Sequence, residues 1–564
     1  MALLSRQCIV RLPDAVTAIR KPSSYRVPGR ASALGQARRW VRTGFFPEDA
    51  DYIDPELPLM SERVGSRWRY MDDPTLRAPV LERSNVGMGM IVLNRPQGFD
   101  LPAVNLAYRK LRDLEVNSFK RFVGLTAPEP SAFAVGLDPR ELLLAATAAA
   151  RRGRLPHFSR ALLWHHQELA HLIADYRKPL VCHISGLAKN GGAATACLAN
   201  FSGAHDLSEV KVDACTMGLV PDGGMTYILA RLRWNLGEFM ALTGWSVKGA
   251  DLVYLELARH WLSPDALPFL ELTAEKQLEV SEIDGRALLD EHSLPLPEGL
   301  RDTDSLPKKF LPLIDHAFAA ESVPAVASRL EQTLRQETDA DTKTFATECL
   351  ERMKRASPLA LHAAFHLIRK AKLAIQEEHR ARFSEAMTAP PRPLSASADL
   401  TSVGHHGEHG ALVKVLRLEL RVQQRLLTSH DAVVGLHARC LDQPAPVDGW
   451  SRRDLKDVIG EEEVGELMRP PEDAEDFSVA PRTEFPFSQH PRLRRYHPDY
   501  NPATGLDHDP AWMAAEMRRW SPSFFEEQRR QTIEDLLGGA DPALYGFSEK
   551  PFSRFVRVEP SKKK

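Results

Sequence analysis

The chain of 564 residues is long enough for several domains, and its composition of 43% hydrophobic and 26% charged residues is ordinary for a globular protein. This composition excludes a fibrous or wholly disordered protein. The formal net charge of −2 also excludes the basic excess of a protein that coats nucleic acid. The charge is unevenly distributed, because residues 1–45 carry a formal charge of +8 and the rest of the chain therefore carries −10.

The segment 1–45 is rich in Arg and Ser and nearly free of acidic residues, with short apolar stretches interrupted by Arg6 and Arg11. This pattern is typical of a mitochondrial presequence; the alternative is a disordered basic arm. No segment approaches the ~20 consecutive apolar residues of a membrane-spanning helix. We therefore expect a protein of the mitochondrial matrix that makes no membrane contact.

The six cysteines form neither CxxC pairs nor a secreted disulfide framework, which agrees with a reducing compartment. One short cluster, His405, His406, Glu408 and His409, has residue types that bind metals. It lies in a Ser/Gly-rich stretch, so a solvated loop is the favoured interpretation. We expect neither a metal nor a cofactor.

Residues 46–85 are polar and dotted with proline, which predicts an extended arm before the first regular element. Short apolar runs then alternate with segments of helical periodicity up to about residue 300. This alternation predicts an α/β core over residues 86–300 with largely parallel, buried strands. The expected strands are 89–93, 122–125 and 179–184, and the expected helical regions between them are 102–114 and 139–176.

Residues 301–468 are expected to form a helical module, with a Pro/Ser-rich insertion near 388–408. Its expected helices are 310–319, 326–335, 342–355, 359–375 and 412–427. The remaining segment, 469–564, is a Pro- and aromatic-rich extension. Residues 481–564 contain 12 aromatic residues and ten prolines, too many aromatics for a purely solvated linker. We expect this extension to lie along another surface.

Three glycine-containing turns, at residues 131–138, 185–192 and 218–224, follow strands of the core in order. A tight turn that opens a helix directs backbone N–H groups to one point, and two such turns can converge on a developing oxyanion. Each turn alone is a weak signal, since glycine after a strand is usually turn chemistry. Their order and spacing together make the signal specific.

With these turns, the chain resembles the crotonase (enoyl-CoA hydratase/isomerase) superfamily, and within it the 3-hydroxyisobutyryl-CoA hydrolases of mitochondrial valine breakdown. The resemblance covers roughly residues 80–468. It implies a crotonase-like fold with a parallel-strand β-β-α superhelical core and a helical C-terminal module. The residues that carry it are 92–96 (VLNRP), Lys178-Pro179, 241–244 (ALTG) with Lys248-Gly249, Ser357-Pro358, His430-Asp431 and Trp450.

The resemblance implies that the backbone N–H groups of Val135 and Gly191 form an oxyanion hole for a thioester carbonyl. Backbone donors do not depend on the side chain, so Val135 in place of a smaller residue is compatible with this role. Asn190 stands where the family usually has the first of three glycines, and it adds a Cβ at a place of close approach.

The family's catalytic segment reads Pro-Glu-Thr-Ala-x-Gly-Leu-x-Pro-Asp, and this chain has Asp213 to Asp222 in its place. Asp222 is retained, but Ala214 replaces the glutamate and has no proton to exchange. Asp213 would substitute only after a one-residue slip, because neighbouring side chains diverge. Cys215 is expected to be a buried filler rather than a nucleophile.

The C-terminal module keeps its scaffold residues but has Val434, His437 and Gln443 where the family has Glu, Arg and Lys. Cations at these positions would help to hold the CoA phosphates. Their replacement indicates that acyl-CoA binding is at most vestigial.

Two functions follow from the resemblance. The first is an active mitochondrial 3-hydroxyisobutyryl-CoA hydrolase, in which Asp222 polarises water or binds the 3-hydroxyl. The second, which the lost side chains and the long extensions favour, is a pseudoenzyme that keeps the fold as a rigid block. Members of the family act in this way in the small subunit of mitochondrial ribosomes in some lineages, and the chain resembles these most.

A ribosomal role implies ribosomal proteins as partners, with a few contacts to small-subunit rRNA through the terminal arms. Residues 481–564 have a formal charge of only +2, so protein docking is favoured over an RNA-binding arm. The cations available for RNA or partner contacts are Arg494, Arg495, Arg518, Arg519, Lys562, Lys563 and Lys564.

Overall fold

The protein is described from a computed structural model of the whole chain. Residues 79–478 are placed, except for several short segments, and residue 531 is placed as well. The segments outside the description are 85–86, 96, 118, 121, 128–131, 264–265, 267–291, 296–307, 389–409, 453, 457–458 and 471–475. The expected presequence, most of the arm 46–85, the insertion with its histidine cluster and nearly all of 479–564 therefore lie outside the described residues.

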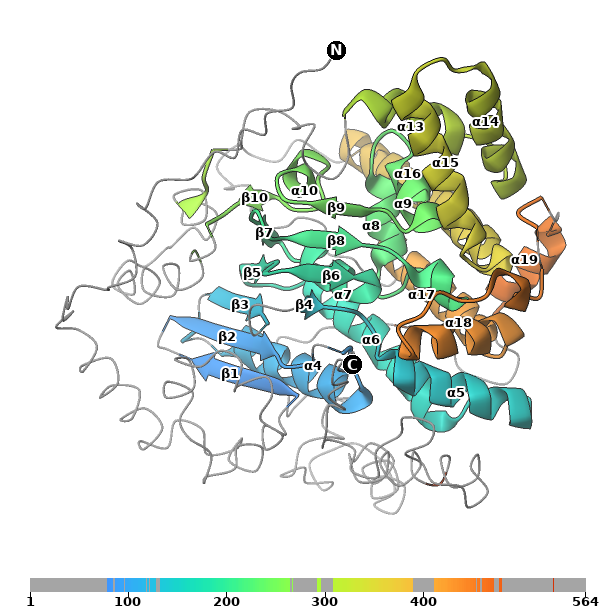
Figure 1. Cartoon of the computed structure of the whole chain (residues 1–564). Coiled ribbons are helices and arrows are strands. Elements are labelled where there is room, and N and C mark those ends of the chain that lie inside the picture. Colours follow the sequence, from blue (N-terminus) through green and yellow to red (C-terminus); the bar gives the residue numbers. More distant parts are fainter. Residues whose placement is uncertain are drawn as a thin grey trace, which may run out of the picture. The chain divides into compact units, whose positions relative to one another are not determined.

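A six-stranded sheet forms the base of the core, in the order β1-β2-β3-β5-β7-β10 (Figure 1). Its strands are parallel except for β1, which pairs antiparallel with β2. Every residue of β2 is buried, as expected for a parallel strand covered on both faces. The strands are β1 (Val80–Ser84), β2 (Met88–Leu93), β3 (Phe122–Thr126), β5 (Leu180–His183), β7 (Phe201–Ala204) and β10 (His260–Trp261).

A second sheet has four strands in the order β4-β6-β8-β9. Strands β4, β6 and β8 are parallel, and β9 pairs antiparallel with β8. Because parallel strands end at the same edge of a sheet, the segments that follow β4, β6 and β8 meet there. The strands are β4 (Ala132–Ala134), β6 (Leu187–Lys189), β8 (Glu209–Lys211) and β9 (Ser246–Lys248).

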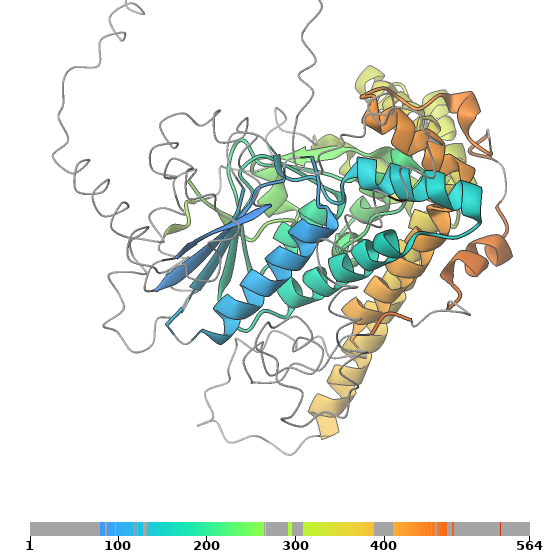
Figure 2. The ribbon, with the colours of Figure 1, turned by 90° about the horizontal axis from the view of Figure 1, so that it is seen from below.

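Local chemistry explains two of the helix ends in the core. Asp100 caps α4 by accepting a hydrogen bond from the N–H of Ala103, and α4 packs beside α6 (Figure 2). Residues 139–176, expected to be one helical region, form two helices, because Gly153 adopts a left-handed conformation with φ +69°. These core helices are α4 (Leu101–Val116), α5 (Pro139–Arg152), α6 (His157–Ala174), α7 (Asn190–Cys197), α8 (Met225–Arg231), α9 (Leu236–Thr243) and α10 (Asp251–Tyr254).

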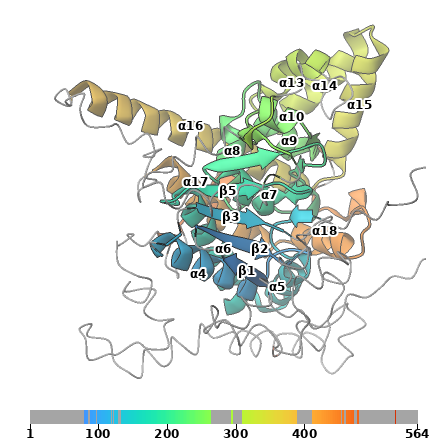
Figure 3. The same ribbon diagram turned by 90° about the vertical axis from the view of Figure 1, so that its left-hand side faces the viewer.

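The expected helical module is present from residue 308 onward. Its longest helix, α16, continues to Thr388, beyond the expected end at Ile375, and its far end projects past its neighbours (Figures 2 and 3). Residues 376–388 contain neither Gly nor Pro, so nothing in the sequence ends the helix earlier. The helices are α13 (Leu311–Phe318), α14 (Val323–Gln336), α15 (Ala340–Lys354), α16 (Pro358–Thr388), α17 (Ala411–Leu426), α18 (His430–Cys440) and α19 (Glu461–Met468), with short 3-10 turns at η4 (Ala214–Met217), η6 (Lys308–Phe310) and η7 (Val447–Gly449).

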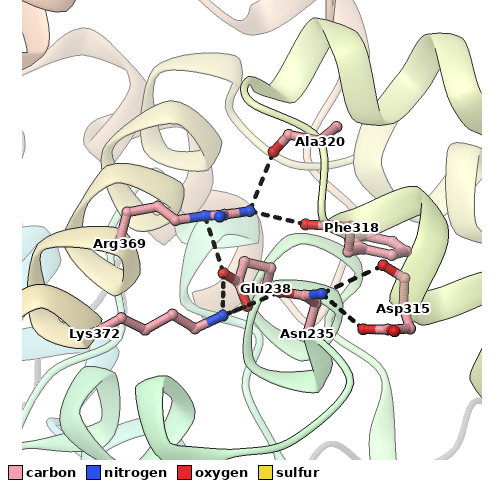
Figure 4. A network of polar contacts seen from close by, with 7 residues as sticks. All are labelled: Asn235, Glu238, Asp315, Phe318, Ala320, Arg369 and Lys372. Atoms are coloured by element: carbon pink, nitrogen blue, oxygen red, sulfur yellow. Dashed lines mark hydrogen bonds and ion pairs between the residues drawn. The ribbon is translucent and has the colours of Figure 1, made fainter. Parts of the chain in front are cut away.

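A buried ionic network joins the core to this module (Figure 4). Glu238 of α9 is fully buried and accepts hydrogen bonds from the Lys372 ammonium at 2.6 and 2.8 Å. The Arg369 guanidinium lies 3.1 Å from the same carboxylate and also donates to the carbonyls of Phe318 and Ala320. Two cations therefore compensate one buried anion, as burial of a charge requires.

Among the described residues, no helix combines the length and the apolar character that a membrane crossing requires.

Candidate active site

All three turns identified in the sequence come together: the first two meet at the edge of the second sheet, and the third approaches Gly191 through Asp222 and Gly223. Val135 follows β4, and Gly191 lies in the first turn of α7, directly after β6. A Cβ built on Gly136, whose φ is +80°, would lie 3.4 Å from the nitrogen of Gly191. A Cβ on Gly192 would collide with the carbonyl of Ala134. Glycine is therefore required here for close approach of two backbones, and the two expected oxyanion donors lie in adjoining turns.

The N–H of Gly191 already has a partner inside the protein. It donates to the Oδ1 atom of Asp222 at 3.0 Å, and Asp222 is buried. Burial raises the pKa of Asp222, while His166 and the Gly191 N–H both act to lower it. A thioester oxygen could accept this hydrogen bond only if the carboxylate moved away.

His166, on α6, is a residue of this site that the sequence did not reveal. Its Nδ1 atom lies 3.7 Å from the Oδ2 atom of Asp222, and burial lowers the pKa of His166. The ring packs against the backbone of Gly191 and Gly223, where side chains would collide with it. In the sequence, His166 looks like one more residue on the inner face of a helix, and only the fold brings it to Asp222.

Ala214, which the resemblance implies as the position of the family glutamate, is buried in the first turn of η4, and its methyl side chain offers no polar atom. The neighbouring Asp213 is held by other groups. Its carboxylate accepts hydrogen bonds from Lys189 and from the Asn190 amide, both at 3.1 Å. Its own N–H donates to the Asn190 side-chain oxygen at 3.0 Å. The carboxylate that would have to replace the missing glutamate is therefore engaged in a separate network.

Several charges act on Asp213. Burial alone would raise its pKa, but Lys189, Lys211 and Arg439 together hold the pKa below its usual value. Asp213 is thus ionised and paired, which is a poor state for a general acid at neutral pH.

Cys215 matches the expected buried filler. Its thiol lies within a weak hydrogen-bond distance, 3.7 Å, of the carbonyl of Ala360. Burial raises the pKa of Cys215 to about 12, so the nucleophilic thiolate is absent at neutral pH.

Residues of the C-terminal module hold the segment that contains η4 in place. Asp431 is fully buried and accepts hydrogen bonds from the Ser357 hydroxyl and from the Ser451 N–H. The Ser357 N–H in turn donates to the carbonyl of Cys215 at 3.0 Å. The backbones of α18 and η4 are in contact, since a Cβ on Gly435 would collide with Met217.

Helix α17 supplies a second brace that the sequence did not reveal. Glu419 accepts hydrogen bonds from the N–H groups of Gly224 and Thr226 at 2.8 and 2.9 Å. Burial raises the pKa of Glu419 to about 8, and the charge of Asp222 acts in the same direction. Gln423, one turn further, accepts a hydrogen bond from the Val220 N–H. The whole segment 218–226 is therefore fixed by helices of the module.

The three replaced positions of the CoA region lie on or just after α18. Val434 is half-buried against Trp450, whereas His437 and Gln443 are exposed. The expected partner contacts between Arg494 and Lys564 lie outside the described residues. In the described part of the chain, no group of three or more His, Cys, Asp or Glu side chains is arranged to hold a metal ion.

Comparison with known proteins supplies the family context. Residues 88–389 match the family model described as enoyl-CoA hydratase/isomerase. Mitochondrial 3-hydroxyisobutyryl-CoA hydrolases are 25% identical (Rattus norvegicus, over 397 residues) and 24% identical (Homo sapiens, over 379 residues). The two alignments cover 70% and 66% of this chain, and 89% and 84% of the relatives.

Solved structures support the expected fold. A carnitinyl-CoA dehydratase from Mycobacterium thermoresistibile aligns with a TM-score of 0.54 at 22% identity. An enoyl-CoA hydratase from Rhodobacter sphaeroides 2.4.1 aligns with a TM-score of 0.52 at 24% identity. Each alignment covers 70% of this chain and 97% of the other. The expected α/β crotonase-like fold is confirmed.

Proposed function

The chain belongs to the enoyl-CoA hydratase/isomerase family, and we propose that it is a catalytically degenerate, 3-hydroxyisobutyryl-CoA hydrolase-like member that serves as a structural component of the small subunit of the mitochondrial ribosome. In this role the crotonase-like body is a rigid block. The segments outside that body make the specific contacts with neighbouring ribosomal proteins.

The observation that carries the loss of catalysis is the hydrogen bond from Gly191 to Asp222. An oxyanion hole works because its donors are oriented in advance toward the charge that develops in the reaction. Here one donor is turned to a buried carboxylate, which would also repel an oxyanion. Removing one such donor typically costs about 10²–10³ in turnover.

The replaced carboxylate adds to this loss. With Ala214 in the glutamate position, no general acid or base is available there, and loss of such a group costs about 10²–10⁴ in rate. The two losses do not simply multiply, because catalytic groups act together. Even the smaller of them would reduce hydrolysis to a trace.

The interactions of the scaffold are complete in this chain, although the catalytic glutamate position is Ala214. Asp431, Ser357 and Ser451 remain joined by hydrogen bonds, and the ionic network around Glu238 is complete. Intact packing beside a missing catalytic group is expected of a protein that is used for its shape.

The ribosomal part of the proposal is supported by chain length and by the kind of relative. About 30% of the chain lies outside the alignment with the rat enzyme, although that alignment covers 89% of the enzyme. This chain therefore carries segments additional to a nearly complete hydrolase body. The 3-hydroxyisobutyryl-CoA hydrolases that it resembles are mitochondrial, which supports a mitochondrial location.

An assay of the purified full chain with 3-hydroxyisobutyryl-CoA tests the catalytic part. We expect no more than trace hydrolysis under conditions in which the rat mitochondrial hydrolase turns over, which serves as the positive control. Robust turnover by the unmodified chain would contradict the proposal.

Density fractionation of a mitochondrial lysate tests the structural part. The full chain is expected to migrate with small-subunit rRNA and to leave those fractions when the subunit is dissociated. Migration only as a free small oligomer would exclude the ribosomal role, whatever the hydrolysis assay shows.

The alternative function, an active mitochondrial hydrolase, is favoured by one observation. The turns of Val135 and Gly191 are still close together, and Asp222 is retained beside them. In this case binding of a substrate would displace the Asp222 carboxylate from Gly191. The hydrolysis assay separates the two functions.

A further inference from the structure

Positively charged side chains gather around Asp213, next to the candidate catalytic turn. Lys189 at the end of β6 lies 3.1 Å from the Asp213 carboxylate, and Lys211 at the end of β8 lies 3.8 Å from it. Arg439 of α18 is close enough to act on the charges of both Asp213 and Lys211. Helix α18 reaches this place because its backbone packs against η4.

These cations are not balanced within the cluster. Lys189 and Lys211 lie against the carboxylate of Asp213 and the charge of Arg439 acts on it, so two positive charges are left over among these four groups. A fourth cation, Arg352 of α15, also acts on Lys211, but it forms two hydrogen bonds with Glu348 and stacks on Trp245. It is therefore neutralised locally.

The repulsion between the cations acts on the pKa of Lys211 in a definite direction. Burial lowers the pKa of Lys211, Asp213 raises it, and Lys189, Arg352 and Arg439 lower it further. A cation in such surroundings is stabilised by any anion that can reach it. The side chain of Lys211 is 33% exposed and reaches solvent, whereas that of Lys189 is only 8% exposed and lies deeper.

We propose that Lys189, Lys211 and Arg439 form a binding site for a phosphate dianion, either inorganic phosphate or the terminal phosphate of a small phosphomonoester. Two surplus positive charges match one dianion. Ammonium and guanidinium groups supply the charge-assisted donors that phosphate oxygens prefer. The partly buried position of the cations favours a compact tetrahedral anion over the backbone of a nucleic acid.

The site is independent of the proposed loss of hydrolase activity, because it uses neither Ala214 nor the Gly191 N–H. The proposed site lies beside the hydrogen bonds that join Asn190 and Asp213. Its test is a binding measurement, so its failure would leave the assignment of function unchanged.

Titration calorimetry and thermal unfolding of the full chain with inorganic phosphate test the site. Saturable binding is expected, with a rise in melting temperature that acetate and chloride at equal ionic strength do not reproduce. Equal stabilisation by all three anions would overturn the proposal, because it would reflect general charge screening.

The variant Lys211→Met should weaken phosphate binding by about tenfold or more, since it removes one charge-assisted contact. Without phosphate the same variant should melt at the same temperature as the wild type or higher, because repulsion is relieved. The matched control is Lys248→Met, on the neighbouring strand β9, whose partner is Glu209. It should bind phosphate like the wild type.

A second variant, Arg439→Met, should weaken phosphate binding by a similar factor. It keeps the site testable if Lys211→Met does not fold. Loss of affinity in Lys248→Met equal to that in Lys211→Met would overturn the assignment of the site. Competition with phenyl phosphate identifies the source of the anion: competition supports a phosphomonoester site, and its absence, with phosphate bound, supports a site for the free ion.

Discussion

Under the proposed function, one hydrogen bond from Gly191 gives Asp222 a structural role in place of a catalytic one. In a hydrolase of this family the retained aspartate is expected to face the substrate. Here its carboxylate binds the Gly191 N–H and lies beside His166, so it stabilises the turn that it would otherwise serve. Reintroducing a glutamate at position 214 does not reverse this arrangement.

Ala214→Glu should therefore leave hydrolysis of 3-hydroxyisobutyryl-CoA at the background level. It should also lower the free energy of unfolding by about 2 kcal/mol or more, because a buried methyl group is replaced by a carboxyl group with no prepared partner. Urea unfolding and the thioesterase assay measure the two effects. The control Ala340→Glu places the same side chain at an exposed position in the first turn of α15 and should change stability by at most about 0.5 kcal/mol. Substantial hydrolysis by Ala214→Glu would show that the rest of the site is intact.

His183 and His205 form a buried pair with ring centroids 4.8 Å apart. Burial, reinforced by His205, lowers the pKa of His183 to about 3, and burial lowers the pKa of His205. In the unfolded chain a histidine takes up a proton near pH 6.5, whereas folded His183 stays neutral down to about pH 3. Its contribution to stability is therefore fully present above about pH 6.5 and is lost as the pH falls from there toward 3.

Below pH 6.5, His183 should reduce the free energy of unfolding by up to about 1.4 kcal/mol per pH unit. The measurement is the difference in unfolding free energy between the wild type and His183→Leu at pH 7.5, 6 and 5. This difference should shift in favour of the variant as the pH falls. The control is His316→Leu, which removes an exposed histidine in the same way. A constant difference for His183→Leu would contradict the prediction.

At the scale of elements, helices of the C-terminal module hold parts of the core in place. Helix α16 carries both cations that compensate Glu238 of α9, and α17 and α18 hold the segment 214–226. The segment 214–226 thus depends on residues more than a hundred positions later in the chain.

Glu238→Ala should lower the free energy of unfolding by about 3–5 kcal/mol, because it leaves Lys372 and Arg369 without their buried partner. The control is Glu256→Ala, which breaks an exposed ion pair with Arg233 and should cost about 1 kcal/mol or less. Chemical denaturation measures both. Similar small losses in the two variants would mean that the network is not a structural joint.

An element could be predicted when its own residues determine its formation. It could not be predicted when it depends on pairing with another segment. The buried strands and most helices followed from apolar periodicity, because burial of one face selects the same residues in sequence and structure. The break at Gly153 was missed, since one glycine within a helical pattern is often tolerated. Strand β1 was also missed, because its formation depends on pairing with β2 and its residues are mostly polar.

The candidate site was predictable only in part for the same reason. The turns of Val135 and Gly191 carry glycines that mark them in the sequence, and the missing glutamate is visible at Ala214. The partners of Asp222 and Asp213 are not marked. His166 and Lys189 reach these carboxylates through tertiary packing, which leaves no periodic signal.

At the scale of the whole molecule, we propose that the chain consists of a rigid block and of extensions that make the contacts. The block is the crotonase-like fold, and the extensions carry the cations between Arg494 and Lys564 that are candidates for RNA or partner contacts. Their low net charge favours docking on protein with few phosphate contacts.

Association with the small subunit should accordingly depend weakly on salt. Raising the salt concentration from 50 to 200 mM should weaken it by about tenfold for two phosphate contacts, against about a thousandfold or more for six or more. Quantitative sedimentation across this range measures the dependence. A full-length variant with Arg494, Arg495, Arg518 and Arg519 changed to Ala should retain most of its association. Complete release of this variant would indicate an RNA-binding arm instead.

Under the proposed function, the reciprocal hydrogen bonds between Asn190 and Asp213 make the loss of activity hard to reverse in evolution. Changing Asn190 back to glycine would strip Asp213 of two hydrogen bonds, and changing Asp213 back to proline would strand the ammonium of Lys189 in a buried place. Each single reversion thus lowers stability before any other can restore chemistry. A pseudoenzyme that acquired this network would have to cross several unfavourable intermediates to become a hydrolase again.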